Sequence, residues 1–188
     1  PKLRRSFEAA HPAVKLSQSE LTQSEIFTAL RQGDIDLAIS YAIDLPNDLE
    51  FQAIKSLPPF VMLAPDHPLA KNKILKVEQL NDHAMVLLDL PLSSDYFLSF
   101  FNRTGPRPII AERTKDLAVA RSLVANGFGF SVINYRPIGT HAPDGKPLIF
   151  VPLESEVPPL PVGLLSLKGL ASRSIYSAFL DLCREEMK

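Results

Sequence analysis

Three residues near the start of the chain, Glu20, Leu21 and Thr22, lie where a predicted strand gives way to a predicted helix. The first turn of a helix carries backbone N–H groups without helical partners and the positive end of the helix dipole, so it can hold a carboxylate. Thr22 can also be a plain helix cap, because Thr22 and Glu25 have the spacing of a capping box. One residue can do both, so all three positions are candidate contacts for a small anionic ligand.

Further polar side chains follow other predicted strands, at the ends where open α/β sheets bind their ligands. Hydroxyl groups in these segments can hydrogen-bond a ligand, and a lysine can pair with an anion. The alternatives are ordinary ones: the hydroxyls can cap helices, the other residues can begin loops, and the lysine can be solvated. This second set of candidates comprises Ser40, Tyr41, Leu90, Ser93, Ser94, Thr114, Lys115, Asn134 and Tyr135.

The sequence shows no arrangement typical of an enzyme or a metal site. The single cysteine, Cys183, lies near none of the histidines, and His11, His67, His83 and His141 lack the spacing of metal ligands. No phosphate-binding loop, GxGxxG or GxSxG motif occurs. We therefore expect no catalysis, no cofactor and no metal.

The candidate contacts need strands and helices to position them. The first predicted run of alternating strands and helices lies near the start of the chain. A strand is predicted at 13–18, followed by a helix that ends at Gly33 and a buried strand at 35–41. Strand, helix and strand in so short a stretch form one βαβ unit.

A second run of the same kind begins with a buried strand at 84–88. Strands at 108–112 and 128–133 follow, each preceded by a predicted helix, and Thr114 is predicted to cap the helix between them. This alternation predicts an α/β fold of two Rossmann-like lobes, each with a mostly parallel sheet. A cleft between two such lobes is the default place for a small molecule.

Composition excludes several classes of protein. The chain has 188 residues with 46% hydrophobic residues, which is enough to bury a core and too apolar for disorder. The net charge of −1 argues against a chain that binds nucleic acid by itself. No apolar run approaches the roughly 18 residues of a membrane span. A single cysteine favours a reducing compartment, and a start at Pro1 without a signal peptide suggests a piece of a longer protein.

Four segments together resemble the effector-binding domain of LysR-type transcriptional regulators. Their shared patterns are F...HP.V.L, then L..G.ID.AI, then DHPLA, and then V..G.G.S.I, in that order. The segments are residues 7–39, 60–70, 74–80 and 121–133. The resemblance implies a fold like that of type II periplasmic binding proteins, with lobe I at 1–82 plus 164–188, lobe II at 83–163, and a small effector between the lobes.

The resemblance also implies partners and a location. The effector would be a small metabolite, for which a carboxylate is one candidate. The domain would form a homodimer or tetramer in the cytoplasm, without a membrane, and would meet DNA only through an N-terminal winged helix-turn-helix domain that this sequence lacks. The first strand of the domain, with its effector-binding loop, is also expected to be missing.

Two departures from the family pattern fall among the candidate contacts. Leu21 stands where many members have Gly, and Asn134-Tyr135 stands where many have Leu-Pro. The identity of the effector therefore cannot be taken over from relatives. Two alternatives stay open at this point, a solute-binding protein of an uptake system and an enzyme on the same scaffold.

Overall fold

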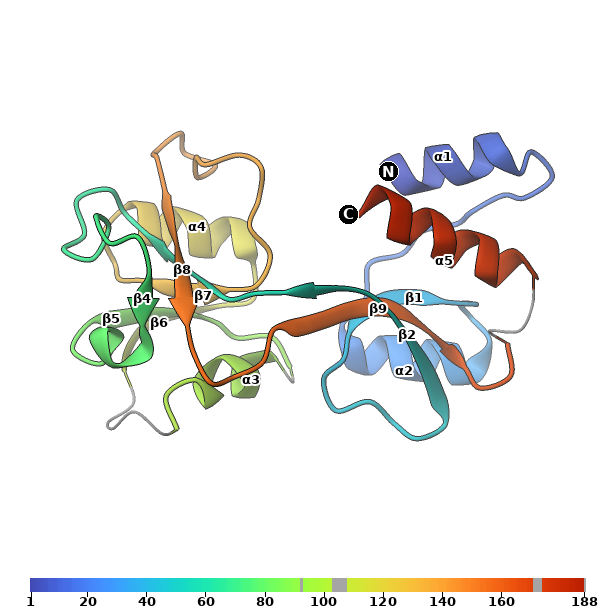
Figure 1. The fold of residues 1–188 in the computed structure, drawn as a ribbon, viewed down its shortest axis with the longest axis horizontal. Helices are drawn as coiled ribbons and strands as arrows, with labels where there is room; N and C mark the ends of the chain where they lie inside the picture. The colour runs from blue at the N-terminus through green and yellow to red at the C-terminus, as the bar shows by residue number, and fades with distance from the viewer. Residues whose placement is uncertain (92, 103–107, 171–173, 188) are drawn as a thin grey trace. The chain divides into compact units, whose positions relative to one another are not determined.

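The structure is a computed structural model that describes residues 1–91, 93–102, 108–170 and 174–187. The chain folds into two compact units, Pro1–Ser56 with Pro161–Lys188, and Leu57–Leu160 (Figure 1). The predicted lobe boundaries at 82/83 and 163/164 differ from this division. The first boundary falls earlier because residues 57–82 pack within the second unit instead of the first.

The first unit contains a three-stranded sheet in the order β1-β9-β2. Strand β1 is antiparallel to β9, with Ala38 opposite Leu165. Figure 1 shows α1 and α5 on one face of this sheet and α2 on the other. The elements are α1 (Lys2–Ala10), α2 (Gln23–Gln32), β1 (Ala38–Tyr41), β2 (Leu49–Leu57), β9 (Leu160–Leu167) and α5 (Ser174–Glu186).

The core of the first unit forms where α1 and α5 pack against the sheet. The ring of Phe7 meets the edge of the Phe179 ring with their centroids 5.0 Å apart. Leu164 of β9 and Leu180 and Cys183 of α5 complete the buried cluster. Along α5, Cys183 lies about one helical turn after Phe179 and Leu180, so these side chains share the one buried face of the helix.

The second unit contains a four-stranded sheet in the order β4-β8-β3-β7 and a parallel pair, β5 and β6. The N–H of Val86 donates to the carbonyl of Phe130 at 2.7 Å, which joins β5 to the start of β7. The elements are β3 (Phe60–Leu63), β4 (Leu75–Lys76), the 3-10 helix η1 (Val77–Leu80), β5 (Ala84–Leu88), α3 (Ser93–Ser99), β6 (Ile109–Thr114), α4 (Leu117–Ala125), β7 (Ser131–Ile133) and β8 (Ile149–Glu154).

The mixed α/β fold confirms the predicted class, but two details of the prediction are wrong. Three of the five strand pairings whose register is resolved are antiparallel, β1 with β9 and β3 with both β7 and β8, so the sheets are not mostly parallel. Residues 13–18 form no strand. Their apolar side chains Val14 and Leu16 do pack on the core, but the N–H of Leu16 donates to the carboxylate of Glu8 at 3.0 Å instead of to a neighbouring strand.

Candidate functional site

The start of α2 forms the predicted capping box. The hydroxyl of Thr22 accepts a hydrogen bond from the N–H of Glu25 at 3.5 Å, and the N–H of Thr22 donates to the carboxylate of Glu25 at 2.7 Å. Hydrogen bonds from Thr22 lower the pKa of Glu25. The chain's own carboxylate therefore already accepts the N–H and the hydroxyl of Thr22 at this helix start. Glu20 and Leu21, just before the helix, are exposed.

Gln23 ties the start of α2 to the end of β1, a role that the sequence analysis missed. Its amide nitrogen donates to the carbonyl of Tyr41 at 3.2 Å and to the carbonyl of Ile43 at 2.8 Å. Two candidate regions, residues 20–22 and 40–41, are thereby brought together in the first unit. Ser40 itself is buried and lies opposite Gly163 in the sheet. No local signal marks Gln23, because its partners are 18 and 20 residues away in the sequence.

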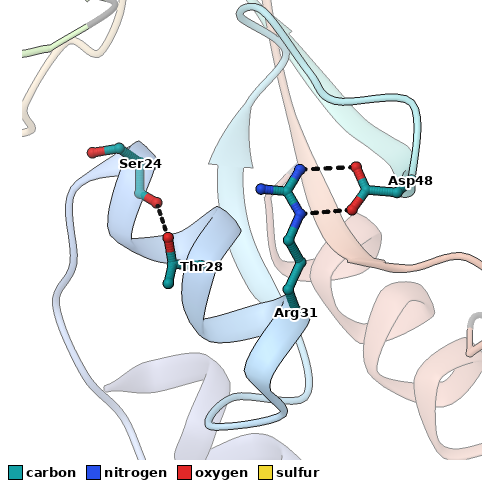
Figure 2. A network of polar contacts seen from close by, with 4 residues as sticks. All are labelled: Ser24, Thr28, Arg31 and Asp48. Carbon is teal, nitrogen blue, oxygen red and sulfur yellow. Dashed lines mark hydrogen bonds and ion pairs between the residues drawn. The ribbon is translucent and has the colours of Figure 1, made fainter.

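The outer face of α2 is held by polar contacts of its own (Figure 2). The hydroxyl of Thr28 donates to the carbonyl of Ser24 at 3.2 Å. Arg31, in the last turn, pairs with Asp48, which precedes β2. The ion pair links the last turn of α2 to the segment that leads into β2, whereas the bond from Thr28 is internal to the helix. None of these residues is a candidate contact.

In the second unit, the carboxyl ends of β5 and β6 meet at one edge. Leu88 lies opposite Thr114, and the N–H of Asp89 donates to the carbonyl of Thr114 at 2.7 Å. An ion pair links the same two strand ends, with Nη1 of Arg113 lying 3.1 Å from Oδ2 of Asp89. The candidate residues that follow β5 and those that end β6 therefore lie close together in the sequence-distant parts of one sheet edge.

The segment after β5 leads directly into α3. The N–H groups of Ser93 and Ser94 both donate to the carbonyl of Leu90 at 3.1 Å, which makes a tight turn into the helix. Both serine side chains are partly exposed. Both serines therefore lie in the segment that follows the carboxyl end of β5, with side chains that solvent reaches in part.

The predicted cap of α4 is wrong. Asp116 is the residue at the helix start, and its carboxylate accepts from the N–H groups of Ala118 at 2.6 Å and Val119 at 3.4 Å. Thr114 instead ends β6, and its hydroxyl accepts from the N–H of Asp116 at 3.2 Å. An aspartate two residues later competes for the same role because its carboxylate is an equally good cap. Lys115, between them, is exposed.

Asn134 and Tyr135 directly follow β7. A parallel bridge between Met85 of β5 and Phe130, just before β7, shows that the two strands run in the same direction, so the carboxyl end of β7 lies at the same edge as that of β5. Asn134 is buried, and its amide nitrogen donates to the carbonyl of Leu57 at 2.9 Å and to the hydroxyl of Tyr96 at 3.0 Å. Burial raises the pKa of Tyr96, and the bond from Asn134 partly opposes this. Tyr135 is 55% exposed.

A pocket of about 580 Å³ lies elsewhere in the second unit. It is lined by the end of β4 and the start of η1, the end of α3, and the end of β8 with the segment after it, including Lys76, Ser99, Glu154 and Ser155. None of the candidate contacts from the sequence lines this pocket. Within the part of the chain that the structure describes, no group of three or more metal-binding side chains occurs, and no helix is long and apolar enough to cross a membrane.

The LysR substrate binding domain is the family whose model matches this chain, over residues 1–188, and the chain belongs to that family. A curated relative is the HTH-type transcriptional regulator YnfL of Escherichia coli, which is 27% identical over 130 residues. That match covers 68% of this chain and 44% of YnfL, so the chain spans about half the length of the curated relatives it matches. YnfL is a transcriptional regulator, and the matching family is the binding domain of such regulators and not a known enzyme class.

Solved structures agree with this assignment. HinK, a LysR family transcriptional regulator from Pseudomonas aeruginosa, has a TM-score of 0.93 and 30% identity, and the match covers 100% of this chain and 66% of HinK. The effector-binding domain of BenM, solved with its effector benzoate, has a TM-score of 0.81 and 18% identity, and the match covers 99% of this chain and 84% of the BenM chain. The effector-binding domain of QuiR, solved in complex with shikimate, has a TM-score of 0.80 and 20% identity, and the match covers 99% of this chain and 88% of the QuiR chain. The fold is therefore the two-lobe fold of LysR effector-binding domains, which is of the periplasmic-binding-protein type II kind.

Proposed function

We propose that the complete protein is a LysR-type DNA-binding transcription regulator and that this domain senses a small metabolite for it. The observation that carries the proposal is the family match along the whole chain, residues 1–188. The domain itself would perform no reaction. Contact with DNA would be made by a winged helix-turn-helix domain outside this sequence, and the protein would act in the cytoplasm as a homodimer or tetramer.

The effector is proposed to be a small organic carboxylate. Benzoate and shikimate, the ligands named for BenM and QuiR, are both carboxylates. In this chain, Ser93 and Ser94 follow β5 and Thr114 ends β6, so that three hydroxyl-bearing residues belong to segments at the carboxyl ends of these strands, and Lys115 beside Thr114 is exposed and cationic. Hydrogen bonds to a charged group are worth about 1.5–3 kcal/mol, so two or three of these donors are enough to select a carboxylate over a neutral analogue.

The proposed contacts lie just before α2 in the first unit and at or after the ends of strands in each unit. In the second unit, the pairing of β5 with β6 and the bond between Asp89 and Thr114 support a common position for the residues that follow these strands. In the first unit, the bonds from Gln23 support a common position for residues 20–22 and 40–41. The proposed set is Glu20, Leu21, Thr22, Ser40, Tyr41, Leu90, Ser93, Ser94, Thr114, Lys115, Asn134 and Tyr135.

For sensing to become regulation, the effector must favour one arrangement of the protein over another. A tenfold preference corresponds to about 1.4 kcal/mol, and typical couplings between sites are about 1–3 kcal/mol. Interactions of this size are within reach of a few hydrogen bonds to a carboxylate. The switch therefore needs no chemistry beyond differential binding.

A thermal-shift screen of this domain against small organic acids tests the proposal, with benzoate and shikimate among the probes. A ligand present at about 100 times its Kd adds about 2.7 kcal/mol to the free energy of unfolding, which raises the melting temperature by several degrees. Amides or alcohols of the same carbon skeletons serve as matched controls. If no acid in the screen raises the melting temperature more than its neutral analogue does, the proposed effector class is wrong.

A further inference from the structure

Two histidines of the second unit lie with their rings in contact. The ring centroids of His67 and His83 are 4.8 Å apart, and the ring planes are tilted by 52°. His67 belongs to the turn after β3, and His83 lies between η1 and β5. Both residues are partly exposed, so protons can reach them from solvent. Histidine is the side chain whose charge ordinarily changes near neutral pH, so the contact between these two segments involves groups that can respond to acid.

The ring nitrogen Nδ1 of His67 is a hydrogen-bond acceptor for its own turn. The N–H of Leu69 donates to this nitrogen at 3.2 Å. Backbone bonds complete the turn, from the N–H of His67 to the carbonyl of Ala64 at 3.1 Å and from the N–H of Ala70 to the carbonyl of His67 at 2.9 Å. A histidine nitrogen accepts only while it carries no proton, and both nitrogens of a charged imidazole are donors. The bond from Leu69 therefore requires a neutral His67.

The surroundings of His67 also favour its neutral form. Burial lowers the pKa of His67 below its ordinary value of 6.5, and the positive charge of a protonated His83 lowers this pKa further. Asp66, which precedes His67 on the same turn, raises the pKa, but it is the weakest of the three influences. His83 and Asp66 thus act on the ring with opposite signs, one from the segment before β5 and one from the turn itself.

We propose that His67 is an acid-sensitive contact that holds the turn after β3 against the segment before β5 while its ring is neutral and releases the turn when the ring takes up a proton. The added proton occupies Nδ1, so the bond from Leu69 is lost. The charge on His67 then faces His83, whose ring centroid lies 4.8 Å away. This inference is independent of the proposed effector binding, and its test needs no effector.

The direction of the pH dependence follows from the lowered pKa. An unfolded chain binds a proton at His67 near the ordinary value of 6.5, whereas the folded chain binds it only at lower pH. The contribution of this contact to stability is therefore complete above about pH 6.5 and is lost as the pH falls toward the pKa of the folded state. Release of the turn is expected over the same range.

The test follows the amide of Leu69 by NMR as the pH is lowered from about 7.5 to about 5.5, a range that brackets the ordinary pKa of histidine. The Cε1–H signal of His67 reports the protonation of the ring in the same samples. In the wild type, we expect the Leu69 amide signal to shift in step with that protonation. The protection of this amide from hydrogen exchange, relative to an unfolded peptide at each pH, should fall over the same range.

His67→Asn separates the proton from the turn. It removes the titrating ring but keeps an acceptor, because an asparagine side chain can accept from the N–H two residues further on. The Leu69 amide should then stay protected across the whole pH range. His141→Asn makes the same substitution at an exposed histidine of the same unit and should leave the titration of Leu69 as in the wild type. A Leu69 amide that titrates equally in the wild type and in His67→Asn would overturn the proposal.

Two further variants change the charges around His67 and decide the question even if His67→Asn does not fold. His83→Gln removes the positive neighbour and should raise the pKa of His67, and Asp66→Asn removes the negative one and should lower it. In both variants the loss of Leu69 protection should move with the pKa of His67. An unchanged pKa of His67 in His83→Gln overturns the proposal, and so does a loss of protection that does not follow that pKa.

Discussion

The guanidinium of Arg31 holds the carboxylate of Asp48 through two hydrogen bonds, from Nε to Oδ2 at 2.7 Å and from Nη2 to Oδ1 at 2.9 Å (Figure 2). The pair joins the last turn of α2 to the segment before β2. These bonds lower the pKa of Asp48 to about 2, below the value near 3.9 of an aspartate in an unfolded chain. The stabilisation is therefore complete above about pH 4 and is lost as the pH falls toward 2.

Replacing Asp48 with asparagine should lower the melting temperature at pH 7, because the charged partner of Arg31 is lost. The difference from the wild type should shrink as the pH falls through the range from about 4 to 2, where the wild-type carboxylate becomes protonated. Thermal unfolding followed by circular dichroism at a series of pH values measures both effects. Asp34→Asn, at another exposed aspartate of this unit, is the matched control. If the difference in melting temperature between Asp48→Asn and the wild type stays constant down to pH 2, the loss of the ion pair is not its cause.

The cap of α4 gives a second prediction. Asp116→Ala should lower the free energy of unfolding by about 1 kcal/mol, because the N–H groups of Ala118 and Val119 lose their acceptor. Thr114→Ala should cost less, since its hydroxyl accepts from one N–H, that of Asp116 at 3.2 Å, and makes a long bond of 3.5 Å to the carbonyl of the same residue. Urea denaturation of the two variants and of Lys115→Ala, as a neutral neighbour, measures the order. A larger loss for Thr114→Ala than for Asp116→Ala would restore threonine as the cap.

A third prediction concerns the close approach of Gly129 to β5. Its φ is +145°, and a Cβ atom there would lie 2.2 Å from the carbonyl oxygen of Ala84. Gly129→Ala should therefore destabilise the fold by about 3 kcal/mol or more, because backbone has to move. Gly145 also has a positive φ, of +84°, but open space around it, so Gly145→Ala should cost only about 1–2 kcal/mol. If Gly129→Ala and Gly145→Ala lower the free energy of unfolding equally in chemical denaturation, the approach of residue 129 to Ala84 is not tight.

The thiol of Cys183 should be unreactive in the folded protein. Its side chain is fully buried in the core of the first unit, and burial raises its pKa to about 11. The thiolate is the reactive form, so labelling by iodoacetamide at pH 8 should proceed only as fast as the protein opens. Mass spectrometry with and without urea compares the two rates. Rapid labelling without urea would contradict the burial of this residue.

Local patterns predicted the parts of the fold that depend on local physics. The capping box of Thr22 and Glu25 was predicted because its two partners are only three residues apart. The left-handed end of α2 at Gly33, with φ of 75°, was predicted because glycine adopts that conformation without strain. The buried strand at 84–88 was predicted from its apolar run, and β5 has those bounds.

The errors lie where the outcome depends on distant residues. Alternation along 13–18 indicates a strand, but a strand also needs a neighbour, and the N–H of Leu16 finds the carboxylate of Glu8 instead. The sequence shows that elements alternate but not the direction of their pairing, so the antiparallel partners of β3 were missed. The hydrogen bonds of Gln23 and Asn134 were missed because their partners are distant in the sequence: Leu57, for example, is 77 residues from Asn134.

The proposed binding of the effector at the edge formed by β5 and β6 is tested most directly by calorimetric titration of an organic acid identified by thermal shift. Ser94→Ala and Thr114→Ala should each weaken that acid's binding about tenfold, which corresponds to the loss of one hydrogen bond of about 1.4 kcal/mol. Ser155→Ala, in the separate 580 Å³ pocket, should leave the affinity unchanged. Unchanged affinity in Ser94→Ala and Thr114→Ala, with a loss in Ser155→Ala, would contradict the claim and place the effector in that pocket.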